Sequence, residues 1–407
     1  MNMQFLNQLW LAIYPVAAVS SQSLLDLSTV LMFLTTMWLF RKKKIELAFK
    51  KIGIEWAFAS YLGVVIIGYM TNAAADADWV GSLVKFSWLI NIYILIYAFQ
   101  SLQLKTIRII QIISTLTFGP TLYSLLSYAR GVDIITGRDN TRLTGLVNSS
   151  TYHAHGNAVL FIILVSCLYF SIKKLNLAWQ IFSFFSTILL GLSIFLTFTR
   201  GIWISIFISS VLVLLFLDWK KLFYFIFGSA ILFGLFFQVS PKFKDRILMT
   251  NVQSNEERIS LFKVNVQIWK EYPLLGIGYG ENLRRNREYW DRPEWRKPTG
   301  YITSHAHNQF LNVLSSTGIL GLFFFSSILI FFFRKNLLLI RSTSSQSQPE
   351  RYAILLTCLW AQLEFLLACL SDVSFEYAKI RALILLVWAL VIAIEQKPEI
   401  VIEEKNV

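Results

Sequence analysis

The chain has 407 residues, of which 56% are hydrophobic and 15% are charged, and its formal net charge is +13. This composition is far too apolar for a water-soluble domain of that length, so a soluble enzyme or binding module is excluded. The positive charge does not indicate nucleic acid as a partner, because a membrane protein uses Lys and Arg to set its orientation.

Long apolar runs recur along the chain, and each can cross a hydrocarbon layer of roughly 30 Å as a helix. Inside lipid the backbone has to satisfy its own hydrogen bonds, so these runs predict helices. The expected fold class is an all-α integral membrane protein with about twelve transmembrane helices and one large periplasmic loop. The predicted spans are 5–20, 23–40, 54–71, 79–100, 106–129, 155–172, 177–199, 201–218, 221–240, 308–333, 352–371 and 377–394.

Lys and Arg cluster in alternate connections between these spans, for example at 41–44, 173–174 and 334–335. The positive-inside rule therefore places these connections and both termini in the cytoplasm, and the other connections in the periplasm. The chain then divides into three parts. They are helices one to nine in 1–240, the large periplasmic loop in 241–307, and the last three helices with a cytoplasmic tail in 308–407.

The predicted loop 241–307 carries twelve Lys and Arg against eight Asp and Glu. Arg offers a planar fork of donors to phosphate oxygens, so the loop suits an anionic, partly sugar-like ligand. The alternative is that it rests on anionic lipid headgroups. Residues 259–269 have apolar positions at helical spacing and predict an amphipathic helix. The glycine-rich stretch 272–280 predicts a tight turn, since no strand precedes it as a dinucleotide site requires.

All four histidines fall in two His-Ala-His triplets, His153 with His155 and His305 with His307, at predicted loop-to-helix junctions in one compartment. Three interpretations compete: metal ligands, helix caps, or a general base or donor to a leaving phosphate. No Cys and no carboxylate at short spacing joins either triplet. The sequence therefore predicts no bound metal and no other cofactor.

Two arginines are further candidates. Arg200 lies at the outer junction of the seventh and eighth spans, where a charge is costly unless it is paired or functional, although snorkelling could also place it there. Arg258 follows Glu256 and Glu257, an arrangement that a local ion pair would also explain. Together the two guanidinium groups could neutralise a phosphate-bearing leaving group without a metal.

Four segments resemble one family in order. Residues 303–322 (TSHAHNQFLNVLSSTGILGL) resemble the signature that ends the large loop of the O-antigen ligase and polymerase superfamily. Residues 197–203 (TFTRGIW) look like its Arg-Gly element, and 272–280 (YPLLGIGYG) are similar to its loop motif. Arg258 matches the arginine that precedes that motif, and His307 matches the motif histidine because Asn308 follows it.

The resemblance implies a fold of the glycosyltransferase C type in a bacterial inner membrane, with the active site on the periplasmic face. It implies a metal-independent, inverting transfer of a glycan from undecaprenyl pyrophosphate to lipid A–core oligosaccharide. The expected partners are this O-antigen donor, the acceptor and membrane lipids, not nucleic acid. The oligomeric state is not predicted. The expected catalytic residues are His307, Arg200 and Arg258, and the expected substrate-binding residues are Arg200, Arg258, His305, Asn308, His153 and His155.

Two rival functions stay open. An O-antigen polymerase would use the same donor with a second lipid-linked glycan as acceptor, and the likeness of the loop and its length favour the ligase. A secondary transporter is the alternative from another class. Transporters place polar residues near the midplane in two related halves, whereas this chain places them at one surface and has one oversized loop.

Overall fold

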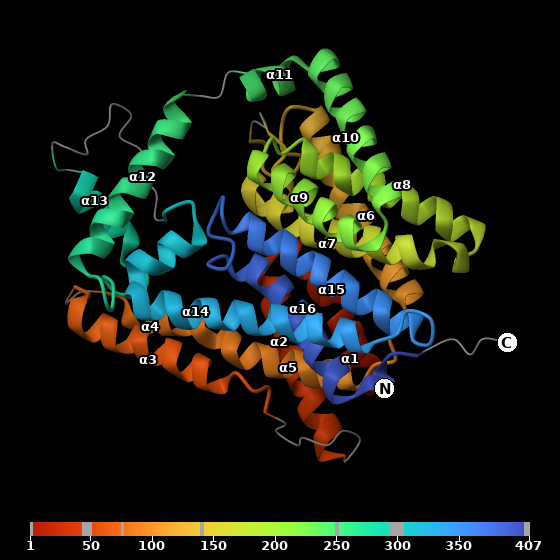
Figure 1. The fold of residues 1–407 in the computed structure, drawn as a ribbon, viewed down its shortest axis with the longest axis horizontal. Coiled ribbons are helices and arrows are strands. Elements are labelled where there is room, and N and C mark those ends of the chain that lie inside the picture. Colours follow the sequence, from red (N-terminus) through yellow and green to blue (C-terminus); the bar gives the residue numbers. More distant parts are fainter. Residues whose placement is uncertain are drawn as a thin grey trace.

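Figure 1 shows the protein as a computed structural model that describes residues 3–42, 51–74, 77–138, 142–248, 252–290, 292 and 305–402. Within these ranges the chain is almost entirely helical and forms no strand. An isolated backbone bridge joins Leu104 to Val401. The predicted all-α class is therefore confirmed for the described residues.

The helices begin at positions that the sequence marks. Ser149, Asn176 and Asn308 each accept a hydrogen bond from a backbone N–H in the first turn that follows, which is the ordinary role of such residues at a helix start. A short 3₁₀ turn joins the fourth and fifth helices. In chain order the described helices are α1 (Met3–Ser20), α2 (Gln22–Arg41), α3 (Glu55–Asn72), α4 (Trp79–Val84), α5 (Trp88–Gln100), α6 (Thr106–Ala129), α7 (Ser150–Ser171), α8 (Leu177–Phe195), α9 (Arg200–Leu217), α10 (Trp219–Val239), α11 (Pro241–Leu248), α12 (Val252–Glu271), α13 (Asn282–Trp290), α14 (Gln309–Ser342), α15 (Pro349–Ala368) and α16 (Ala378–Gln396).

Nine segments of the described chain are long and apolar enough to cross a membrane. They are α2, α4 together with α5, α6, α7, α8, α9, α10, α14 and α15. The three other predicted spans are helices too, α1, α3 and α16, and α16 carries the charged residues Lys379, Arg381 and Glu395. The chain is thus a multi-pass membrane protein, and the count of twelve spans stays a prediction.

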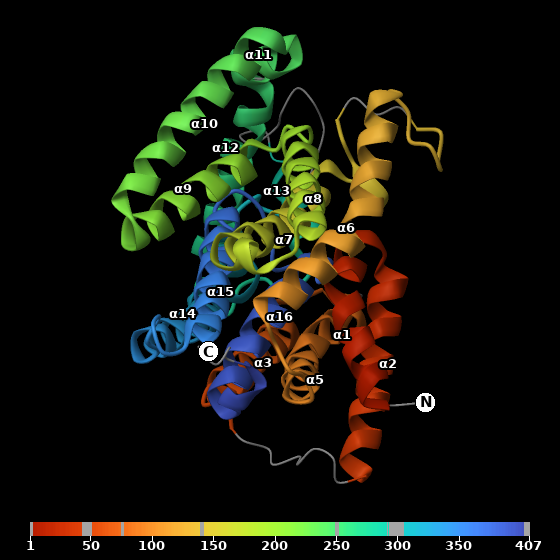
Figure 2. The ribbon, with the colours of Figure 1, turned by 90° about the vertical axis from the view of Figure 1, so that its right-hand side faces the viewer.

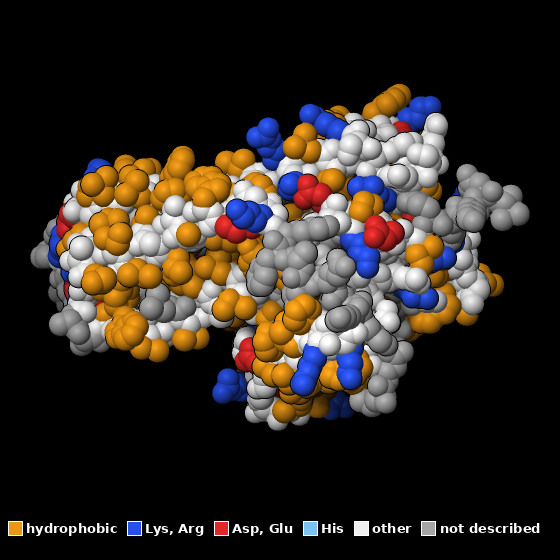
Figure 3. Space-filling model, turned by 90° about the horizontal axis from the view of Figure 1, so that it is seen from below, with side chains coloured by type: hydrophobic (Ala, Val, Ile, Leu, Met, Phe, Trp, Pro, Cys, Tyr) orange, Lys and Arg blue, Asp and Glu red, His pale blue; other side chains and the backbone are white. Residues whose placement is uncertain are grey.

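The outer surface of the bundle suits lipid. Helix α10 buries none of its side chains although nearly all of them are apolar, so only a hydrocarbon environment can cover it. Figure 3 shows hydrophobic side chains spread almost continuously over the left part of one face, while charged side chains gather toward its middle and right. This is the surface expected of a protein that sits in a bilayer and ends in water.

The centre of the bundle is built from α7, α15 and α16. Helix α7 packs along α15, and α16 packs along α5. Figure 2 shows that α7 and α15 lie between two pairs of helices, α1 with α2 on one side and α9 with α10 on the other. Polar bonds join helices inside this core, such as Ser166 to Thr357 at 2.8 Å and Asn7 to Ser101 at 2.9 Å. Between helices in lipid, such bonds and close packing replace the hydrophobic effect as the source of association.

The segment between α10 and α14 is folded where the structure describes it. The predicted amphipathic helix 259–269 is confirmed as part of the longer α12, whose Leu261, Val264 and Ile268 are buried together with Tyr289 of α13. Helix α12 packs on both α13 and α14. The described part of the predicted loop therefore has a small apolar core of its own, and α12 also lies against α14 of the bundle.

The predicted turn 272–280 docks on α14 at a break in that helix. The N–H of Gly278 donates to the carbonyl of Ser316 at 3.0 Å, and Gly318 interrupts α14 with a φ of +68°. A Cβ on Gly276 would lie 2.3 Å from the main chain of Ser316, and one on Gly318 would lie 2.2 Å from the main chain of the turn. Both glycines are required because the two backbones touch.

Candidate active site

The second His-Ala-His triplet lies directly before α14. Asn308 caps that helix: its Oδ1 accepts from the N–H of Leu311 at 2.9 Å, and its Nδ2 donates to the carbonyl of Leu370 at 3.0 Å. His307 before it adopts a positive φ of +49°, an uncommon conformation that aims its ring at the α15–α16 connection. Asn308, expected to contact substrate, thus has both ends of its amide engaged in holding the triplet.

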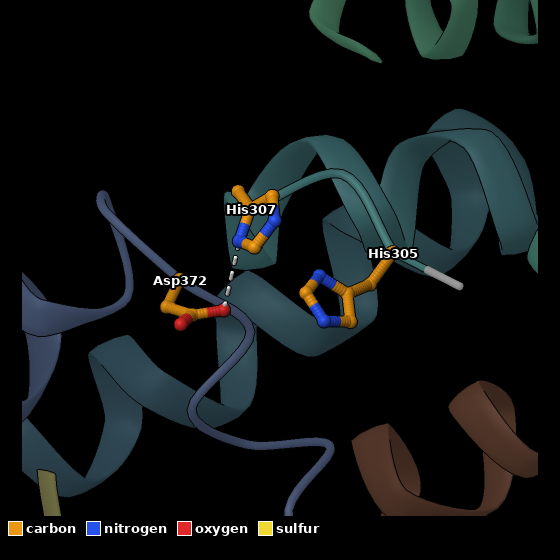
Figure 4. A group of neighbouring side chains, drawn as sticks. All are labelled: His305, His307 and Asp372. Carbon is orange, nitrogen blue, oxygen red and sulfur yellow. Dashed lines mark ion pairs between the residues drawn. The ribbon is translucent and has the colours of Figure 1, made fainter. Parts of the chain in front are cut away.

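A buried carboxylate faces this triplet. Nδ1 of His307 lies 3.5 Å from Oδ1 of Asp372, and the hydroxyl of Tyr377 contacts Nε2 of His305 at 3.0 Å and donates to Asp372 at 3.4 Å. Figure 4 shows both imidazoles turned toward Asp372. The side chain of His307 remains 22% exposed, so part of it is accessible to a ligand.

Burial sets the charges of this group. Burial lowers the pKa of His305 to about 4, against the opposing effect of the Asp372 carboxylate, with small further lowering by His307 and Arg258. Burial alone would raise the pKa of Asp372, but the three imidazoles of His307, His155 and His305 outweigh it and hold that pKa well below its usual range. Burial and the charge of Asp372 raise the pKa of Tyr377, so its hydroxyl stays a donor. Burial thus favours the neutral form of His305, and the hydrogen bond from His307 favours the anionic form of Asp372.

Arg200 is positioned by a sharp turn. It is the first residue of α9, two residues after Phe198, which has a positive φ of +53°. Arg142 holds this turn from the connection between α6 and α7: its Nε donates to the carbonyl of Thr197 at 2.7 Å, and one terminal nitrogen donates to Thr199 at 3.1 Å. The end of α9 that carries Arg200 is therefore fixed from outside the helix.

Arg258 of α12 comes close to the same place. Its charge acts on the guanidinium of Arg200 and on the imidazoles of His155 and His305, so Arg258 lies within electrostatic range of each of these three groups. Two guanidinium groups near each other repel, and an anion between them would remove that repulsion. The arrangement therefore favours a ligand with closely spaced negative charges.

The first triplet is divided by its helix. His153 and His155 are both buried in α7, at 3% and 2% exposure. Residues two positions apart on a helix point in directions about 200° apart around its axis. Nδ1 of His155 contacts the hydroxyl of Ser374 at 2.8 Å, in the same connection as Asp372. His153 instead contacts Ser193 of α8 at 3.3 Å. The structure brings His155 to the group and leaves His153 on the far side of α7.

Three residues of this site were missed by sequence reasoning: Asp372, Tyr377 and Arg142. None of them is in a recognised motif, and Asp372 meets His307 across 65 positions of the chain. The available signal was the predicted topology, in which the short connection 371–376 shares a compartment with both triplets. No carboxylate is close to the histidines in sequence, which argued against a metal, but the fold places the Asp372 carboxylate beside His307.

A comparison with known families agrees with this geometry. Residues 185–326 match the family model described as O-antigen ligase, and this stretch holds Arg200, Arg258, the glycine turn and His307. Among curated proteins, none matches the chain. The match ends before Asp372, and it is the fold that brings Asp372 next to His307 of the matched residues. Over residues 185–326 the chain is thus similar to the O-antigen ligase family.

Proposed function

We propose that the protein is an O-antigen ligase, a metal-independent and inverting glycosyltransferase. It transfers a glycan from undecaprenyl pyrophosphate to lipid A–core oligosaccharide at the periplasmic face of the bacterial inner membrane. The observation that supports this most is the grouping of Arg200, Arg258 and the His307–Asp372 pair, because these groups meet the needs of a lipid diphosphate donor.

In the proposed reaction, the acceptor hydroxyl attacks the anomeric carbon from the side opposite the diphosphate. The bond between that carbon and the distal phosphate oxygen breaks, and undecaprenyl pyrophosphate leaves with the bonding electron pair. Arg200 and Arg258 bind the diphosphate and stabilise the charge that grows on it. Positioned donors of this kind are each worth about 3–4 kcal/mol in the transition state.

His307 takes the proton of the acceptor hydroxyl. If Nδ1 donates its hydrogen to Asp372, the lone pair lies on Nε2, and the carboxylate stabilises the imidazolium that forms. The distance of 3.5 Å is long for a hydrogen bond, and such contacts shorten when substrate binds. Asp372 thus orients the base and does not itself remove the proton. His155 is proposed to hold the Asp372 loop through Ser374.

A transfer assay with purified protein, defined lipid-linked donor and lipid A–core tests the proposal. Arg200→Ala, Arg258→Ala and His307→Ala should each lower kcat by about 10²- to 10³-fold. The matched control is Arg287→Ala, which removes an exposed arginine from α13 of the same loop and should keep full activity. Equal losses in Arg258→Ala and Arg287→Ala would contradict the proposed clamp.

The polymerase is the second candidate, because the family match does not separate the two acceptors. Incubation with lipid-linked repeats alone distinguishes them. A ligase leaves the repeats unextended until lipid A–core is added. Chain growth in the absence of lipid A–core would refute the ligase and favour the polymerase.

A further inference from the structure

We propose that His305, His307 and Asp372 also form a binding site for a transition-metal dication such as Zn²⁺, and that the bound ion inhibits transfer. The proposal starts from geometry: one ligand atom from each of these three residues lies within 4.8 Å of the others. Two imidazoles and one carboxylate are a donor set that suits Zn²⁺.

The three groups need to move little to bind an ion. Around a tetrahedral Zn²⁺ with bonds of about 2.0 Å, neighbouring ligand atoms lie about 3.3 Å apart. His307 and Asp372 are already 3.5 Å apart. Small rotations of the His305 and His307 side chains therefore complete three sides of the site, and a water would serve as the fourth ligand.

A second layer of contacts holds the carboxylate. The N–H of Val373 donates to Oδ1 of Asp372 at 2.8 Å, and the Tyr377 hydroxyl donates to the same atom at 3.4 Å. Contacts of this kind orient metal ligands and raise affinity. The charge of Arg258 opposes a cation, so this site binds an ion less tightly than the same three ligands would without it.

Inhibition follows from the chemistry of the imidazole ring. An ion bound to Nδ1 of His307 uses the lone pair of that nitrogen, so the single hydrogen of the neutral ring moves to Nε2. Nε2 then donates a hydrogen bond and cannot accept the proton of a hydroxyl. This half of the inference rests on the proposed function, whereas the binding half does not.

Binding is measured on tag-free, full-length protein in detergent after treatment with EDTA and desalting. Titration calorimetry with Zn²⁺ should give one site per chain, and Co²⁺ should give the visible absorption of a tetrahedral complex. His305→Ala and Asp372→Asn should abolish both signals, and Tyr377→Phe should weaken binding by about 10- to 100-fold. His153→Ala, a buried histidine on the far side of α7, should leave binding unchanged.

Two results would overturn the binding site: no stoichiometric binding, or binding that survives in both His305→Ala and Asp372→Asn. Inhibition is measured separately on the unmodified protein, where saturating Zn²⁺ should stop transfer and EDTA should restore it. Binding at this site with undiminished transfer would overturn the inhibition and count against His307 as the base. Loss of transfer on treatment with EDTA alone would show a required metal and also overturn the inhibition. Loss of activity in Arg200→Ala tests the proposed function independently of both.

Discussion

Asp372→Asn is the substitution that tests the His307–Asp372 pair most directly. Asparagine keeps the shape of the side chain and can still accept the N–H of Val373, so the loop should keep its conformation. It removes the negative charge that lies 3.5 Å from His307. The substitution therefore separates the electrostatic role of Asp372 from its role in packing.

The size of the effect can be worked out from that distance. Two unit charges 3.5 Å apart attract by roughly 5 kcal/mol at an effective dielectric constant of about 20. Because the His307 side chain is 22% exposed, water screens part of this attraction, and we expect about 2–3 kcal/mol to be lost in the transition state. That loss corresponds to a fall in kcat of about 30- to 160-fold.

The assay is steady-state transfer with separate values of kcat and KM. The control is Asp133→Asn, which replaces another carboxylate of 4% exposure that accepts backbone N–H groups, in the connection between α6 and α7. Asp372→Asn should lower kcat with little change in KM, and Asp133→Asn should leave both values unchanged in the folded fraction. A kcat of Asp372→Asn within threefold of the unmodified protein would refute the reasoning.

Three further outcomes are expected. Exhaustive chelation with EDTA should leave the rate of transfer unchanged or higher, and a fall would contradict metal independence. Arg142→Ala should lower the free energy of unfolding by about 1.5–3 kcal/mol, because it removes charge-assisted hydrogen bonds to the turn before Arg200. It should also lower kcat. A thermal melt measures the first effect and the transfer assay the second. Burial raises the pKa of Glu271, but hydrogen bonds, chiefly from Tyr289, lower this pKa below its usual 4.5. The carboxylate should therefore stabilise the packing of α12 on α13 fully above pH 4.5, and this stabilisation should be lost as the pH falls further. Tryptophan fluorescence should show this acid transition, and Glu271→Gln should lack it.

Much of the fold was predictable because its signals are local. Apolar runs of membrane-spanning length mark most of the helices, and the glycines of 272–280 mark a turn whose three glycines all have positive φ. Helix α12 extends further toward its start than the predicted 259–269, because its first turns carry polar residues that show no apolar spacing. Local patterns identify such elements but not their ends.

The site was predictable only in part. Arg200, Arg258 and His307 were found because they lie in recognisable segments, but Asp372 is 65 residues away from His307 and only the packing of α14 against α15 unites them. Nothing in the sequence distinguishes the two histidines of the first triplet. In the structure they point to different sides of α7, His153 to Ser193 and His155 to Ser374. Asn308 could have been predicted as a helix cap, because Asn directly before an apolar helix is a common start signal.

The contact between the glycine turn and α14 constrains how α12 can move relative to the bundle. Backbone bonds pin the C-terminal end of α12 through the turn to Ser316, so that end acts as a pivot. For the proposed ligase, a movement of α12 about this fixed end would carry its first half, with Arg258, the furthest, and so would change the spacing between Arg258 and Arg200.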